Sequence, residues 1–115
     1  MKHVLSLSGA DQRKSFAVSF VPDREMVAVL PEGELDMDSS EFLERKIAEL
    51  RAVGTPLLVI NLRGLKFMDS CGLRSLIALR DDCERTGQDL ELIPGPPAVQ
   101  RLFTLTGTRG LFVWR

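Results

Sequence analysis

The sequence predicts a small α/β domain with a mixed, mostly parallel sheet of about five strands and three helices. Short strand-like runs alternate with segments of helical spacing, and Gly or Pro residues separate them. The run Leu57–Leu62 is apolar apart from Asn61, as expected for a central strand that helices bury on both faces. Because strand–helix–strand crossovers are right-handed, we expect the second, third and fourth strands to be parallel, with the first strand added antiparallel.

The length and composition predict one domain with its own core. The chain has 115 residues, of which 44% are hydrophobic and 27% are charged. This is ordinary globular composition and close to the common size of a single domain. We therefore expect an N-terminal arm or edge strand over residues 1–14 and a single domain over residues 15–115.

The first two strands are predicted over residues 16–20 and 26–30. Pro22 and Asp23 lie between them, where proline fixes one backbone dihedral and aspartate can bond its own backbone. The two strands should therefore form a hairpin.

The first helix follows the second strand, because the apolar residues then change to helical spacing. Asp38 and Glu41 are spaced as in a capping box, and Gly54 with Pro56 ends the helix. The inward residues are Leu43, Ile47 and Leu50. The acidic residues predicted to form a solvated face are Glu41, Glu44 and Glu49.

Two further helices and two further strands complete the predicted order. The second helix begins near Asp69 and Ser70, and Gly87 ends it. One side of this helix is predicted to carry Leu73, Leu76, Ile77, Arg80 and Cys83. The fourth strand covers residues 90–93. The third helix starts at Pro96–Pro97 and ends at Gly107, and a last strand covers residues 111–114. The predicted inner stripe of the third helix is Val99, Leu102, Phe103 and Thr106.

The charge and hydropathy patterns exclude several function classes. Fifteen Lys and Arg balance sixteen Asp and Glu without a long run of one sign, and aromatic residues make up 6%, so we expect no direct nucleic-acid binding. The longest apolar run is far shorter than the roughly 20 residues that cross a bilayer, so we expect no membrane insertion. Cys71 and Cys83 would lie about 18 Å apart on one helix, too far to pair, which fits a reducing, cytoplasmic location. With His3 as the single histidine, they form no metal-ligand cluster, and we expect no cofactor.

Ser70 is the candidate residue for chemistry. It stands where a buried strand passes into a helix, and a helix N-terminus stabilises a nearby anion such as a phosphate. The alternative is that Asp69 or Ser70 only caps the helix. In open α/β sheets the functional crevice lies beyond the carboxyl ends of the strands, where Asp36 also falls.

Several segments resemble one known family. The segment from Asp69 to Leu73, the run Val59–Leu62, the segment Gly33–Asp36 and the segment Pro97–Phe103 are similar to the STAS domain of bacterial anti-sigma factor antagonists. The resemblance spans residues 16–114 and implies a small STAS-type fold. It also implies two partners. One is an anti-sigma factor that is a serine kinase of the histidine-kinase-like ATPase fold and that releases its sigma factor when this chain binds it, and the other is a PP2C-type phosphatase.

The resemblance assigns roles to individual residues. Ser70 matches the phosphorylated serine, and Asp69 matches the acidic residue before it. Asp36 matches an aspartate in the partner contact, and Gly72 matches a glycine that lets a partner backbone approach. Cys71 and Arg74 depart from the family pattern, where Ser or Thr and a second Gly are usual, so they bear on which partner is bound. The hypothesis is that the unphosphorylated protein binds the anti-sigma factor and that a charged Ser70 abolishes binding.

Three alternatives stand beside this hypothesis. Cys71 could act as a nucleophile, since a helix N-terminus favours thiolate, but no base accompanies it apart from the distant His3. Arg63, Lys66 and Arg74 could attract a phosphate or an acidic partner, or could be solvated surface. A STAS adaptor that is not phosphorylated, serving a transporter or a stress-signalling complex, would use the same fold.

Overall fold

The structure is a computed structural model that describes every residue except 1–8, 12–15, 24, 53 and 55. The helices among the described residues are α1 (Met37–Arg51), α2 (Ser70–Thr86), α3 (Pro97–Thr106) and two 3-10 turns, η1 (Leu62–Gly64) and η2 (Arg109–Leu111). The strands are β1 (Gly9–Asp11), β2 (Phe16–Pro22), β3 (Met26–Leu35), β4 (Leu57–Asn61), β5 (Leu65–Met68), β6 (Asp89–Ile93) and β7 (Val113–Trp114).

The strands form one mixed sheet in the order β1-β2-β3-β4-β6-β7, with β5 paired to the far end of β3. β1 and β2 pair antiparallel, as do β2 and β3, whereas β3, β4, β6 and β7 run parallel. The predicted α/β class is confirmed. The strands predicted as second, third and fourth are β3, β4 and β6, and they are parallel as expected. The rest of the predicted N-terminal arm, residues 1–8 and 12–14, lies outside the described residues.

The sheet differs from the prediction at β3, β5 and β7. β3 continues five residues beyond the predicted end, to Leu35, and its extension pairs with β5. Sequence reasoning missed β5 because it has only four residues, too few to sustain an alternation of apolar and polar side chains. β7 is shorter than predicted because residues 109–111 form η2 instead.

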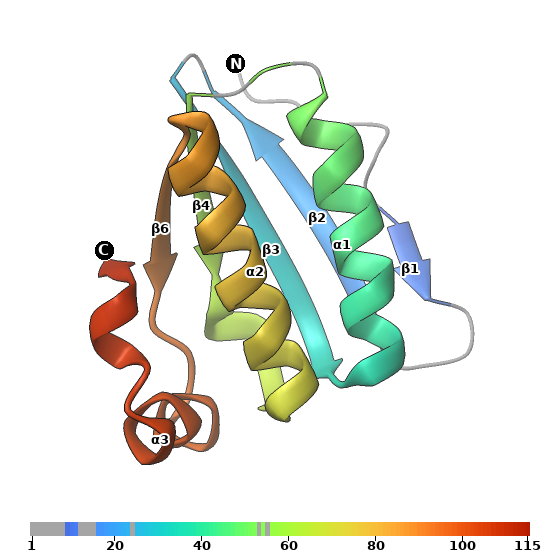
Figure 1. The fold of residues 1–115 in the computed structure, drawn as a ribbon. Helices are drawn as coiled ribbons and strands as arrows, with labels where there is room; N and C mark the ends of the chain where they lie inside the picture. Colours follow the sequence, from blue (N-terminus) through green and yellow to red (C-terminus); the bar gives the residue numbers. More distant parts are fainter. Residues whose placement is uncertain (1–8, 12–15, 24, 53, 55) are drawn as a thin grey trace.

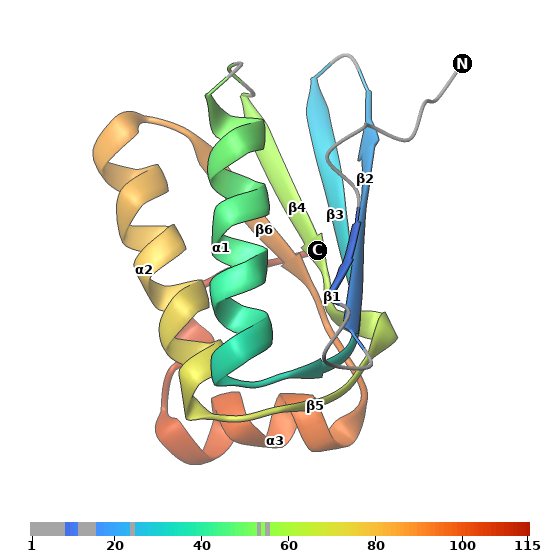
Figure 2. The ribbon, with the colours of Figure 1, turned by 90° about the vertical axis from the view of Figure 1, so that its right-hand side faces the viewer.

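The helices form one layer on the sheet and a cap at its end. α1 and α2 lie side by side on the same face and run in the same direction (Figure 1). α3 lies across the end of the molecule where β3 and β5 finish and both long helices begin (Figure 2). The N-terminal ends of α1 and α2 and the helix α3 therefore meet at one end.

The core lies between the sheet and α1 and α2. Leu58, Val59 and Ile60 of β4 are at most 1% exposed, which confirms a central strand buried on both faces. The predicted inward residues of α1 are also buried. In α3 the prediction for Thr106 was wrong: it is the last helical residue and is exposed, with its hydroxyl donating to the Leu102 carbonyl at 2.6 Å.

Two of the residues predicted along this side of α2 are only partly buried. Ile77 packs against the core, and the Arg80 guanidinium donates to the Leu111 carbonyl and pairs with Glu84. Leu73, Leu76 and Cys83 are buried as predicted. None of the described helices is both long and apolar enough to cross a bilayer.

Candidate functional site

The candidate site lies where β3 and β5 end side by side. Leu35 pairs with Met68 in the parallel register, and the Asp69 amide donates to the Leu35 carbonyl at 3.1 Å. Each strand is followed at once by an aspartate that caps a helix, Asp36 for α1 and Asp69 for α2. The pairing of β3 with β5 therefore places two capping aspartates, 33 positions apart in the sequence, directly after adjacent strand ends.

Asp69 fixes the first turn of α2. Its Oδ1 accepts hydrogen bonds from the backbone amides of Cys71 at 2.9 Å and Gly72 at 3.1 Å. Ser70 is the first helical residue and is exposed, and its hydroxyl makes no hydrogen bond with any described residue. Of the two capping alternatives, the cap is Asp69. The Ser70 hydroxyl is left available to another molecule.

Asp36 fixes the first turn of α1 in a different way from the predicted one. Its carboxylate accepts from the Ser39 amide at 3.1 Å, and its own amide donates to Ser39 Oγ at 2.9 Å, which makes a reciprocal capping box. The capping box predicted from Asp38 and Glu41 was wrong. Asp38 instead lies in the first turn, where its charge favours the helix dipole.

Gly72 lets the first turn of α2 pack closely against the ends of β3 and β5. A Cβ at this position would lie 2.8 Å from Met68 Cγ, 2.9 Å from Leu35 Cγ and 2.9 Å from the Leu35 carbonyl oxygen. Gly72 is also buried. On the side where a Cβ would stand, Gly72 faces the end of β3, and the expectation that it also lets a partner backbone approach stays a prediction. Gly72 thus lets α2 start directly against the two strand ends.

Comparison with known proteins identifies the family. A model of the STAS domain matches residues 20–114. The chain belongs to the STAS domain family.

Several of the proteins that it resembles are anti-sigma factor antagonists. The anti-sigma-B factor antagonist of Staphylococcus aureus is 29% identical over 79 residues, which cover 69% of this chain and 73% of that protein. Among solved structures, an anti-sigma factor antagonist from Mycobacterium paratuberculosis is 26% identical with a TM-score of 0.80, covering 92% of this chain and 89% of that one. The unphosphorylated anti-sigma factor antagonist SpoIIAA is 24% identical with a TM-score of 0.71, covering 88% of each chain, and supports the fold alone.

The two departures from the family pattern differ in exposure within this STAS domain. Cys71 is half-buried, and Arg74 is exposed on the next turn of α2. For the nucleophile alternative, His3 lies outside the described residues, and no group of His, Cys, Asp or Glu within the described part of the chain could hold a metal ion. Cys83 is a core residue, and burial raises the pKa of its thiol, with Arg51 opposing and Asp82 adding to the shift.

Sequence reasoning missed two apolar side chains at the same end of the STAS domain. Met37, directly after Asp36, is 62% exposed, and Phe67, two residues before Asp69, is 47% exposed. Both immediately flank the strand ends that carry the two aspartates. No periodicity marks Phe67, because its strand was not predicted, and Met37 precedes the stripe of α1. At a site that binds a partner, exposed apolar side chains of this kind would supply contact area.

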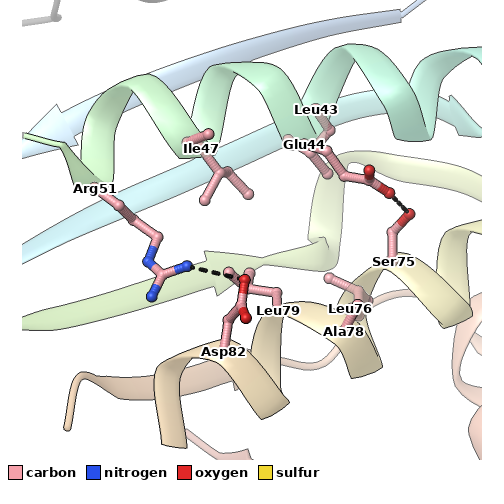
Figure 3. Close-up of a pocket in the computed structure, with 10 residues that line it drawn as sticks. Leu43, Glu44, Ile47, Arg51, Ser75, Leu76, Ala78, Leu79 and Asp82 are labelled. Carbon is pink, nitrogen blue, oxygen red and sulfur yellow. Dashed lines mark hydrogen bonds and ion pairs between the residues drawn. The ribbon is translucent and has the colours of Figure 1, made fainter. Parts of the chain in front are cut away.

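A hollow of about 170 Å³ lies between α1 and α2, away from the strand ends (Figure 3). Apolar side chains, among them Leu43, Ile47 and Leu79, line it. On its rim, Ser75 Oγ donates to Glu44, and Arg51 pairs with Asp82 at 3.6 Å. Glu44 is exposed, as predicted, and it also accepts this hydrogen bond from α2. No residue predicted for the site lines this hollow.

Proposed function

We propose that this STAS domain is an anti-sigma factor antagonist that is switched by phosphorylation of Ser70. The unphosphorylated form binds an anti-sigma factor kinase of the histidine-kinase-like ATPase fold and so releases the sigma factor. Phosphorylation abolishes the binding, and a PP2C-type phosphatase restores it. One observation carries the proposal: Ser70 presents an exposed hydroxyl at the first residue of α2, without a hydrogen-bond partner among the described residues.

The relatives support the class of partner. The staphylococcal relative and the mycobacterial structure are both described as antagonists of anti-sigma factors. Both cysteines are unpaired, which fits the cytoplasm, where sigma factors act. The domain itself is proposed to do no catalysis, since the kinase supplies the ATP chemistry.

The contact surface is proposed to surround Ser70. We define it by the exposed or half-buried residues at the strand ends, which are Asp36, Met37, Phe67, Asp69, Ser70, Cys71 and Arg74. Met37 and Phe67 supply apolar area, and the aspartates and Arg74 supply charge that selects the partner. Gly72 contributes through α2, whose start it holds against β3.

The physics of the switch follows from charge. A phosphate adds about 1.5 to 2 negative charges to Ser70. In the free domain the phosphate lies at the exposed start of α2, so the fold itself need not change. In the complex it would have to be desolvated next to Asp69 and Asp36, and burial of an unpaired charge is strongly unfavourable. Phosphorylation therefore acts on the interface and not on the fold.

The test uses purified anti-sigma factors encoded in the same genome. Each is incubated with the domain, ATP and Mg²⁺, and phosphate is mapped by mass spectrometry. We expect one of them to modify Ser70 and to leave Ser70→Ala unmodified. Phosphate on another residue, with Ser70 unmodified, would contradict the proposal.

A matched pair of variants tests the binding step. Ser70→Asp and Ser70→Asn are nearly equal in size and differ in charge. Ser70→Asp should weaken binding of the anti-sigma factor by at least about 30-fold, the range for a buried unpaired charge, while Ser70→Asn should retain most of the affinity. Equal weakening by both would indicate a steric effect. A domain that binds a partner but is phosphorylated by none of the anti-sigma factors would favour the adaptor alternative.

A further inference from the structure

The backbone donors next to Ser70 are already in use. The amides of Cys71 and Gly72 donate to the Asp69 carboxylate, and the Leu73 amide donates to the Asp69 carbonyl at 3.1 Å. A phosphate has three strong acceptor oxygens that seek donors. On Ser70 it would therefore find the next three amides of the helix occupied, and the helix N-terminus alone does not hold it.

The fixed charges at the strand ends are also unfavourable. Asp69 immediately precedes Ser70, and Asp36 follows the neighbouring strand, whose last residue accepts a hydrogen bond from the Asp69 amide. Like charges at this range oppose a second anion. A phosphate on Ser70 needs a counter-charge from a basic side chain.

Arg74 is placed to supply it. It lies four residues after Ser70 in α2, so the two side chains are neighbours on one face of the helix, with about 5–6 Å between their Cβ atoms. An anion four residues before a cation is also the favourable order along a helix. Both residues are exposed, so neither has to leave the core to meet the other.

Arg74 is also uncommitted. It makes no ion pair and no side-chain hydrogen bond with any other described residue. In contrast, Arg51, Arg80, Arg85 and Arg115 each pair with a carboxylate. The guanidinium can therefore turn to the phosphate without breaking a contact of the domain.

From these contacts we infer that Arg74 binds the phosphate on Ser70 within the same chain. The planar guanidinium can donate two parallel hydrogen bonds to phosphate oxygens. The inference rests on the proposed phosphorylation of Ser70 and adds a second consequence to it. Phosphorylation both adds negative charge and withdraws a cation from the contact surface, so it changes two charges that a partner meets.

Lys66 provides the matched control. It is exposed on β5 and, like Arg74, pairs with no described carboxylate. It also lies four residues from Ser70, but along an extended strand, where four residues span about 13 Å. Both residues thus carry one positive charge, and only Arg74 shares a helix face with Ser70.

The experiment installs phosphoserine at position 70 during translation, so that no kinase is needed. The second pKa of the phosphate is then measured by ³¹P NMR in the parent, Arg74→Gln and Lys66→Gln proteins at low ionic strength. Because a nearby cation favours the dianion, Arg74→Gln should raise this pKa by about 0.3 pH unit or more. Lys66→Gln should change it by much less.

Two outcomes would overturn the inference. One is an unchanged pKa in Arg74→Gln, and the other is an equal rise in both variants, which would reflect general surface charge. Circular dichroism confirms that each variant is folded, and Arg74→Lys should retain part of the effect. The kinase assay tests the proposed function separately. A pKa that responds to Arg74 in a protein that no kinase modifies would contradict only the proposed function.

Discussion

The two ends of the α1–α2 pair differ in how their polar groups are satisfied. At the C-terminal end Arg51 donates to Gln88 at 2.6 Å and to Thr86 at 3.1 Å, and pairs with Asp82. At the N-terminal end the capping carboxylates are bonded, but Ser70 and Arg74 have no side-chain partner among the described residues. One end is completed within the chain, and the other presents free polar groups beside exposed apolar ones. This difference is in line with the proposal that the N-terminal end contacts a partner.

The largest expected effect on stability comes from disturbing the close packing of Gly72 at the N-terminal end of α2. Gly72→Ala would place a Cβ within 2.9 Å of the Leu35 carbonyl and of two side-chain atoms. We expect it to destabilise the domain by about 2 kcal/mol, since overpacking typically exceeds the gain in helix propensity. Urea unfolding measures this.

The control for this variant is Gly110→Ala, where an added Cβ meets nothing within 4 Å. It should change the free energy of unfolding by less than about 0.5 kcal/mol. If Gly72→Ala changed the free energy of unfolding as little as Gly110→Ala, the close packing of α2 against the strand ends would not matter for stability.

The C-terminal end of the α1–α2 pair should lose stability when the Arg51 guanidinium is removed. Arg51→Ala removes contacts to Gln88, Thr86 and Asp82 and is expected to destabilise the domain by about 1 kcal/mol, since the network is partly exposed. Arg74→Ala should have almost no effect on the stability of the unphosphorylated domain. Thermal unfolding of both variants at the same pH tests the contrast, and equal losses would contradict it.

Exposed apolar residues at the N-terminal end of the α1–α2 pair should contribute more to binding than to folding. Phe67→Ser is expected to weaken binding of the anti-sigma factor by about 1 kcal/mol, or roughly fivefold, because an exposed side chain would be buried in the complex. Calorimetric titration measures the affinity. Leu105→Ser, which changes a 76% exposed residue of α3 outside the defined contact surface, serves as the control and should leave binding unchanged. The contact surface would need redrawing if the two variants behaved alike.

The smallest expected effects are on the reactivity of the two thiols and on the stability of the domain at alkaline pH. Half-buried Cys71 should react with a thiol reagent in the native state, whereas buried Cys83 should react only on unfolding. Because burial raises the pKa of Cys83 in the folded state, the folded protein holds this proton more tightly than the unfolded chain. Its contribution to stability is therefore full below the ordinary thiol pKa of about 8.5 and is lost as the pH rises above it. Unfolding of Cys83→Ala against the parent across this range should show a flatter alkaline decline.

The sequence by itself determined the alternation of strands and helices, the buried central strand β4 and the position of Ser70 at a helix start. These are local properties: period, turn residues and a run of apolar side chains suffice to encode them. The capping of α1 was not predictable to the residue, because several acidic and hydroxyl side chains near residues 36–41 could compete for the same amides. In the structure, Asp36 and Ser39 form the capping box of α1.

Only the tertiary structure decided what surrounds Ser70. The short strand β5 has no sequence signal, yet its pairing with β3 brings Asp36 and Asp69 together and leaves Phe67 exposed. Whether Gly72 faces a partner or the chain's own core, and which arginines are already paired, depends on residues distant in sequence. Such contacts arise from how elements pack, and a local pattern carries no record of them.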